Sequence, residues 1–381
     1  MNSRVTNIFK PLLDTLLSTG FFSIAGSSII NRLLSFMSGI IVVRLLSKAD
    51  YGIYSYAYNL LNIALLFNGI GFSSAFIQLC CEPGGRKREN SLELLGFTGG
   101  MGFDLILSVC IFLIATFLPE NMPGTRQLLQ LCALFPIPQF LYDMQSSALR
   151  AQLRNSEYAK ANVINTAFVV AGTLLGAVAH GAIGLLIGRA TGILISTGVV
   201  FYRFGVPVLF TSQGRADLGR ERSLGKNERL DYVKIAISSA LANGISSFTY
   251  LIGTFMIGQL LHDPLEVASY EAASSIPVAL NFIPVTVMTY VYPYFAHHKD
   301  DLLWVRKNYF RLLTLSFIGF GTVSLACALF APQIISLVYG EQYFSSVLPF
   351  RILLIGSWIG ATFRIVSGIY WSLNDWSLQI C

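Results

Sequence analysis

Residues 203–234 read RFGVPVLFTSQGRADLGRERSLGKNERLDYVK, and this polar segment decides how the rest of the chain is interpreted. It carries seven of the 26 Lys and Arg residues of the protein, against four acidic residues. On either side, the sequence is almost continuously apolar, in long runs separated by short hinges. A basic segment between two apolar halves is typical of the cytoplasmic connector of a two-lobed membrane protein.

The composition excludes an ordinary soluble domain. Hydrophobic residues make up 54% of the 381 residues and charged residues 12%, whereas soluble domains carry about 25% charged residues. The mean hydropathy is +0.61. The formal net charge of +6 is explained by where the basic residues lie along the chain, so it does not indicate a nucleic-acid partner. The sequence therefore predicts an all-α integral membrane protein in a lipid bilayer.

Ten apolar runs are candidates for transmembrane helices, which need about 20 residues each. We expect them at residues 20–46, 52–78, 93–118, 127–148, 161–180, 182–203, 234–260, 267–295, 308–330 and 346–371, after an amphipathic lead-in at 1–18. The boundary between the fifth and sixth runs, at His180-Gly181, is the least clear. This division predicts a six-helix bundle at 1–203, a basic cytoplasmic connector at 204–233 and a bundle of about four helices at 234–381.

The distribution of Lys and Arg predicts the orientation. Cytoplasmic segments of membrane proteins are enriched in these residues. With the N-terminus inside, the outer segments hold only Arg44, Lys48 and Arg126. The inner segments then hold the connector cations together with Arg4, Lys10, Arg86, Lys87, Arg88, Arg150, Arg154, Lys160, Lys299, Arg306, Lys307 and Arg311. Ten spans place the C-terminus in the cytoplasm as well.

The sequence holds no pattern typical of an enzyme or of a metal site. The six Cys residues form no pair in an outer loop, and neither they nor the four His residues have the spacing of metal ligands. HExxH and phosphate-binding glycine motifs are absent from the sequence, and no long loop offers room for an active site. We therefore expect no cofactor, no metal and no catalysis.

The functional hypothesis rests on polar residues inside the predicted spans. Arg32 is near the middle of the first span, and Ser28, Ser35 and Gly39 share its helix face. A cation at the centre of a bilayer costs at least about 2.5–3.5 kcal/mol on insertion scales, so this face is expected to border a polar cavity. The alternative is a structural arginine bonded to carbonyls of a neighbouring helix.

Other polar residues extend this set. Asn59 and Asn62 share one face of the second span, and Asn281 lies between Pro277 and Pro284, which loosen the helix. Bent helices near polar groups are typical of transporter binding sites, although amides between spans more often bond helices together. Asp104 and Asp143 can neutralise an arginine across helices, or belong to a cation site. The remaining polar residues in predicted spans are Asn68, Arg189, Asn243, Tyr250, Glu271, Arg351 and Arg364.

An internal similarity supports two lobes of the same build. Residues 52–57 follow the first span and residues 268–273 follow the seventh, and Tyr54 and Ala57 correspond to Tyr270 and Ala273. The second copy would be an incomplete repeat, because it stops after four spans.

Several motifs resemble those of bacterial polysaccharide flippases. Residues 44–54, RLLSKADYGIY, are similar to the R-x-L-[GS]-x-x-[DE]-[FY]-G-x-Y signature that follows the first helix of O-antigen (Wzx-type) transporters. These transporters belong to the multidrug/oligosaccharidyl-lipid/polysaccharide exporter superfamily. LRAQ at 149–152 resembles the exit of that family's fourth span, and VYGEQY at 338–343 resembles its outer loop before the tenth.

The resemblance implies a V-shaped pair of helical bundles around a central cavity, working by alternating access. It implies a flippase of the cell inner membrane that moves an undecaprenyl-pyrophosphate-linked oligosaccharide, a repeat unit of O-antigen, capsule or exopolysaccharide, to the outer leaflet. The polysaccharide polymerase and chain-length machinery are then possible partners. Spans one, two, seven and eight would line the cavity, which favours Arg32, Asn59, Asn62, Asn243, Glu271 and Asn281, with Arg364 in second rank. In this family Arg44, Tyr51 and Gly52 would close the first hairpin.

One departure leaves alternatives open. Members of the family usually have twelve or more spans, whereas ten are expected here. An inactive truncated flippase or a membrane scaffold is therefore one alternative. A multidrug or cation exporter of the same superfamily is another, supported by Asp104, Asp143 and Glu271, although the polar residues within the spans are on balance basic. Glu271 is the candidate carboxylate for ion coupling.

Overall fold

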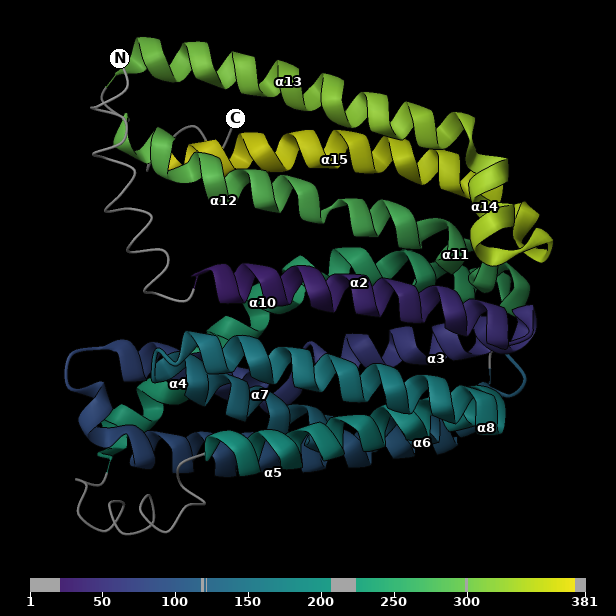
Figure 1. Ribbon diagram of the computed structural model, residues 1–381. Helices are drawn as coiled ribbons and strands as arrows, with labels where there is room; N and C mark the ends of the chain where they lie inside the picture. The colour runs from purple at the N-terminus through teal and green to yellow at the C-terminus, as the bar shows by residue number, and fades with distance from the viewer. Residues whose placement is uncertain (1–20, 118–119, 121, 207–223, 299–300, 374–381) are drawn as a thin grey trace. The chain divides into compact units, whose positions relative to one another are not determined.

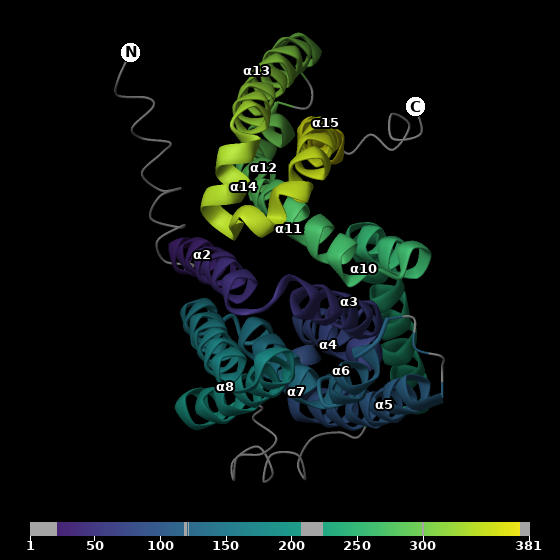
Figure 2. The ribbon, with the colours of Figure 1, turned by 90° about the vertical axis from the view of Figure 1, so that its right-hand side faces the viewer.

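The computed structural model describes residues 21–117, 120, 122–206, 224–298 and 301–373. Within these ranges, every regular element is a helix. The chain divides into two compact units, Met1–Pro264 and Leu265–Cys381 (Figures 1 and 2). The predicted lead-in and most of the predicted connector lie outside the described residues. The first unit includes the helix that follows the connector, so the units divide at a later position than the predicted lobes.

The described part of the first unit contains eight α-helices and two short 3-10 helices. They are α2 (Phe21–Leu45), α3 (Lys48–Leu65), η1 (Asn68–Gly71), α4 (Phe72–Cys81), η2 (Gly85–Arg88), α5 (Glu89–Phe117), α6 (Thr125–Cys132), α7 (Pro136–Ala151), α8 (Asn155–Phe204) and α10 (Lys226–Leu261). Helix α2 packs on α8, and α4, α5, α6 and α7 pack on one another (Figure 2). Their apolar side chains form one buried core.

The signature segment forms the turn between α2 and α3. The Ser47 hydroxyl oxygen accepts a hydrogen bond from the Asp50 backbone N–H at 3.1 Å and so caps the first turn of α3. One turn later, a Cβ at Gly52 would lie 1.9 Å from the carbonyl oxygen of Pro264. The glycine therefore allows the start of α3 to touch the backbone of Pro264, which follows α10 and is the first residue of α11. This geometry agrees with the structural role expected for Gly52.

Helix α8 is a hairpin of two antiparallel arms. Its backbone leaves helical geometry at His180 (φ −144°) and Gly181 (φ 58°, ψ −137°), which confirms the predicted boundary between the fifth and sixth spans. The arms touch through facing glycines: a Cβ at Gly172 would lie 2.1 Å from the Gly188 carbonyl oxygen, and one at Gly176 would lie 2.0 Å from that of Gly184. Small residues are what allow two helices in a membrane to approach this closely.

Helix α10 runs antiparallel along the α3–η1–α4 ridge of the first unit. Near its start, the Tyr232 hydroxyl donates to the Phe72 carbonyl oxygen at 3.2 Å, and the two rings meet edge to face at 5.3 Å. Near its end, the Gln259 amide donates to the Tyr56 hydroxyl at 2.7 Å. Contacts at both ends of the ridge explain why α10 belongs to the first compact unit.

The second unit is built on α11 (Pro264–Leu280), α12 (Phe282–His297), α13 (Leu302–Leu329), α14 (Ala331–Tyr339), η4 (Glu341–Ser346) and α15 (Val347–Leu373). Helix α15 packs against both α12 and α13 (Figure 1). The Trp358 indole N–H donates to the Phe317 carbonyl oxygen at 2.8 Å, and a Cβ at Gly321 would lie 2.9 Å from the same indole ring. The helix that Pro277 and Pro284 were expected to loosen is interrupted at Asn281, because α11 ends at Leu280 and α12 begins at Phe282.

Seven described helical stretches are long and apolar enough to cross a membrane, or eight when the bent α10 is included. Helix α8 counts once among them, although its two arms correspond to two predicted spans, and the α6–α7 pair corresponds to a further one. The all-helical membrane fold is therefore confirmed. The predicted second span at 52–78 lies within one apolar stretch, Lys48–Cys81, in which η1 separates α3 from α4.

Candidate functional site

The polar face of α2 predicted from the sequence is exposed. Ser28, Arg32, Ser35 and Gly39 are all exposed, whereas Ser27, Ser38 and Val42 of the same helix are buried. A third face carries exposed apolar side chains, Ile29, Leu33 and Met37. Helix α2 therefore separates a polar exposed strip from an apolar one, as a helix between lipid and a polar cavity would.

Asn59 and Asn62 of α3 differ in their surroundings. Asn59 is only 5% exposed, and its amide donates to the Leu251 carbonyl oxygen of α10 at 3.1 Å. Asn62, one turn later, is half-buried. The structure therefore uses Asn59 to join two helices, which is the commoner role of an amide between spans.

The other predicted site residues lie on three further elements. Asn243 is exposed on α10, next to Gly244, which packs near the Leu66 side chain. In the second unit, Glu271 of α11 and Arg364 of α15 are half-buried, and half-buried Asn281 lies at the α11–α12 junction. The convergence of all seven predicted residues on one cavity stays a prediction.

The structure adds a polar cluster that the sequence only partly indicated, at the break in the second span. The break consists of Asn68, Gly69, Ile70 and Gly71, of which the last three have positive φ angles of 54°, 40° and 78°. The Gly69 N–H donates to Asp104 Oδ1 of α5 at 2.8 Å. Two amides converge on Asp143 of α7: that of Asn68 donates to Oδ2 at 3.1 Å and that of Gln139 to Oδ1 at 3.0 Å.

These contacts correct one interpretation of the aspartates. Asp104 and Asp143 were candidates to neutralise an arginine, but no ion pair among the described residues involves either of them. Arg189 of α8 has its guanidinium carbon 4.5 Å from the centre of the Tyr58 ring, so an aromatic face on α3 receives that cation. The sequence signal for the break was the Asn68-Gly69 dipeptide followed by Gly71, a turn pattern inside an apolar run.

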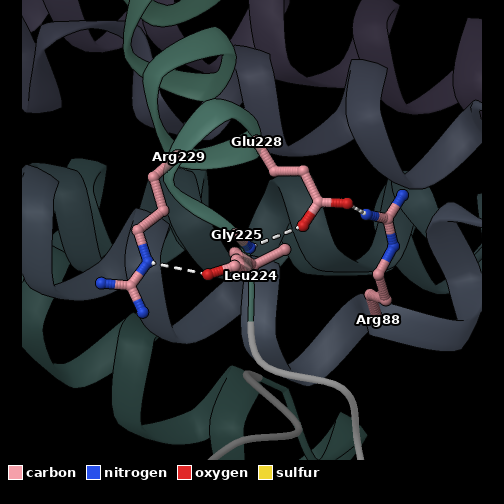
Figure 3. A network of polar contacts seen from close by, with 5 residues as sticks. All are labelled: Arg88, Leu224, Gly225, Glu228 and Arg229. Carbon is pink, nitrogen blue, oxygen red and sulfur yellow. Dashed lines mark hydrogen bonds and ion pairs between the residues drawn. The ribbon is translucent and has the colours of Figure 1, made fainter.

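A charged network anchors the start of α10 in the first unit (Figure 3). One carboxylate oxygen of Glu228 pairs with Arg88 of η2, and the other accepts from the Gly225 N–H at 2.7 Å. The Arg229 side chain donates to the Leu224 carbonyl oxygen at 3.2 Å. The connector therefore ends in a helix start fixed to η2, whose three basic residues were predicted to be cytoplasmic.

Comparison with known proteins identifies the family. The model of the polysaccharide biosynthesis protein family matches residues 41–348, which is most of the chain. The chain belongs to this family. It is a multi-pass membrane protein of polysaccharide biosynthesis and transport, and the flippase family inferred from the motifs is confirmed.

Two individual proteins are similar to the chain. The EPS I polysaccharide export inner membrane protein EpsE of Ralstonia solanacearum is 25% identical over 349 residues, covering 87% of this chain and 76% of EpsE. Among solved structures, the inward closed conformation of the lipid II flippase MurJ superposes with a TM-score of 0.67 at 13% identity. That match covers 93% of this chain and 76% of MurJ. At this identity the match shows a shared fold.

Proposed function

We propose that this protein is a flippase that moves an undecaprenyl-pyrophosphate-linked oligosaccharide, a repeat unit of a surface polysaccharide, from the inner to the outer leaflet of the cell inner membrane. The observation that carries the proposal is the combination of a polysaccharide biosynthesis family with the fold of a lipid flippase. The name of EpsE, an inner membrane export protein, supports both the location and the class of cargo.

The polar strip of α2 supports the choice of an anionic lipid-linked substrate. Arg32 is exposed on that strip, where Ser28, Ser35 and Gly39 have small side chains. A guanidinium stays charged and binds two oxygens of a phosphate at once, and its attraction for an anion is stronger in a cavity of low dielectric constant than in water. Arg32 would bind the pyrophosphate, and Asn62, Asn243, Glu271, Asn281 and Arg364 would contact the glycan as the cavity changes its opening.

We further propose that both chain termini face the cytoplasm, together with the connector and η2. The charge distribution supports this orientation. It also places the Arg88–Glu228 contact on the cytoplasmic side, where the lipid-linked unit is loaded.

The test is the amount and location of lipid-linked glycan in a strain deleted for this gene. We expect the deletion to trap the repeat unit on its carrier in the inner leaflet, and a plasmid copy of the 381-residue chain to clear it. An R32Q copy should clear it at least tenfold more slowly at equal protein level, since a buried phosphate would lose a charged partner worth about 1.5–3 kcal/mol. An unchanged glycan pool with altered resistance to cationic drugs would instead identify an exporter.

A further inference from the structure

The break in the second span contains more acceptor oxygens than donors. Asp104 is fully buried, and only its Oδ1 accepts a hydrogen bond, from the Gly69 N–H. Asp104 Oδ2 and Asn68 Oδ1 are both buried atoms with no hydrogen-bond donor among the described residues. Buried polar atoms normally have partners, because leaving one without a partner costs about 1–3 kcal/mol. Two such acceptors, one on Asn68 of the break and one on the aspartate bonded to the next residue, indicate that a donor or a cation belongs at the break.

The charges around the break are negative. Asp104 and Asp143 interact electrostatically with each other. Neutral amides donate to Asp143, and a backbone N–H donates to Asp104. The break also receives the partial negative charge of the C-terminal end of α3, at Leu65, and the partial positive charge of the N-terminal end of α4, at Phe72, so the negative charge there comes from the two aspartates.

The cations of the surrounding elements lie toward the helix ends. They are Lys48 of α3, Arg126 of α6, Arg150 of α7, the three basic residues of η2, and the basic residues that precede Ala236 of α10, while α4 has no charged residue. On α5, the acid Glu93 lies about three turns before Asp104 and Glu89 about four turns before it. Two tyrosines of these elements are engaged elsewhere: Tyr142 donates to Asn162 of α8 at 2.6 Å, and Tyr232 donates to Phe72.

We propose that the break at Asn68–Gly71 is a binding site for a small monovalent cation, a proton or a sodium ion, held by Asp104 Oδ2 and Asn68 Oδ1 with Asp143 beside them. Carboxylate and amide oxygens are the ligands that hard cations prefer, and a proton on Asp104 would turn an unmatched acceptor into a donor. Broken helices with freed polar groups coordinate Na⁺ or H⁺ in many transporters. A role of this site in driving glycan movement rests on the proposed function, whereas the binding itself does not.

The experiment measures cation binding by the purified full-length protein, without glycan. Thermal unfolding is followed in Na⁺, K⁺ and N-methylglucamine at constant ionic strength, and across pH 5–9. The site variant is Asp104→Asn, which keeps an acceptor for the Gly69 N–H and adds a donor, as a protonated carboxyl would. The control is Asp231→Asn, an exposed carboxylate on α10 whose partner Lys234 is 3.7 Å away and also exposed.

A sodium site predicts that Na⁺, at about 100 times its Kd, raises the Tm of the wild type and of D231N by a few degrees, and that D104N does not respond. A proton site predicts no difference between the salts. The Tm of the wild type then falls as pH rises, because the folded chain holds a proton that the unfolded chain releases, and D104N lacks this slope.

A protonated Asp104 would also contribute the infrared carbonyl band of a neutral carboxyl group, and that band would be missing in D104N. If D104N does not yield folded protein, the response of Tm to Na⁺ and pH is measured with Asp143→Asn in its place. The neutral carboxyl band is then sought in the infrared spectrum of the wild type. Wild-type stability that is independent of Na⁺ and pH, without a neutral carboxyl band, would overturn the proposal. That result would not decide whether the protein clears lipid-linked glycan. Conversely, failure of the chain to clear the glycan would not decide whether the break binds a cation.

Discussion

Asn59 and Asn62 are one helical turn apart on α3, yet only Asn59 joins two helices. The Asn59 amide donates to the Leu251 carbonyl oxygen of α10, and the side chain is 5% exposed. Asn62 is half-buried. The same residue type therefore serves packing at one position and is accessible at the other.

We expect N59A to lower the free energy of unfolding by about 0.6–1.7 kcal/mol, the range measured for hydrogen bonds between membrane helices. N62A should change stability by less than about 0.5 kcal/mol and should instead slow glycan clearance in the deletion strain. Thermal unfolding of both purified variants and the glycan assay separate the two effects. Equal losses of stability in N59A and N62A would contradict the assignment of Asn59 as the packing residue.

At this scale the sequence predicted which polar residues are in spans, but not which contacts they make. Periodicity placed Asn59 and Asn62 on one face, because a helix repeats every 3.6 residues. It did not reveal the neighbour on that face, since α10 lies almost two hundred residues further along the chain. For the same reason Asp104 and Asp143 were considered as partners of arginines, whereas they bond to the break at Asn68–Gly71.

Among the elements, α8 is the clearest case of structure set by residue size. Gly172, Gly176, Gly184 and Gly188 recur every four residues within each arm and face one another across the hairpin. The backbones approach so closely that a side chain of one carbon would reach the opposite carbonyl group. Such contacts gain dispersion energy and weak Cα–H···O bonds that bulkier residues would prevent.

We expect G176A to destabilise the protein by about 1–3 kcal/mol, because its Cβ would lie 2.0 Å from the Gly184 carbonyl oxygen and the arms must separate. G198A is the matched control in the same helix. Nothing lies within 4 Å of a Cβ there, so alanine should be neutral or stabilise the helix by up to about 1 kcal/mol.

The double variant G176A/G184A should cost little more than G176A alone, since both substitutions open the same contact. Thermal unfolding of the four proteins in detergent measures these differences. Similar behaviour of G176A and G198A would show that the arms of α8 are not in close contact in the membrane protein.

The positions of most helices were predictable, because apolar runs of about 20 residues have few other solutions in a bilayer. The internal breaks were harder to predict. The turn at His180-Gly181 and the interruption at Asn281 carried glycine or proline signals, which indicated a boundary at the first and a loosened helix at the second. The break at Asn68–Gly71 has a comparable signal, but its apolar neighbours made the run look continuous. Only the folded chain brings the aspartates of α5 and α7 to the break, where they accept hydrogen bonds from the Gly69 N–H and the Asn68 amide.

On the scale of the whole molecule, two compact units carry different shares of the predicted site. Arg32, Asn59, Asn62 and Asn243 belong to the first unit, and Glu271, Asn281 and Arg364 to the second. Alternating access requires two bodies that move as units around a shared substrate path. The division after Pro264 places α10 with the first unit, so the start of the seventh span would move with η2, to which Arg88 and Glu228 fix it.

The orientation of the whole chain can be tested by labelling single cysteines in a cysteine-free background. Lys87 of η2 and Glu341 of η4 are both exposed. We expect a membrane-impermeant maleimide to label E341C on intact spheroplasts, and K87C only after the membrane is permeabilised, because the charge distribution predicts that η2 faces the cytoplasm. Labelling in the opposite order would reverse the topology. It would also move the Arg88–Glu228 contact and the loading side of the cavity to the outer face, which a flippase filled from the cytoplasm does not allow.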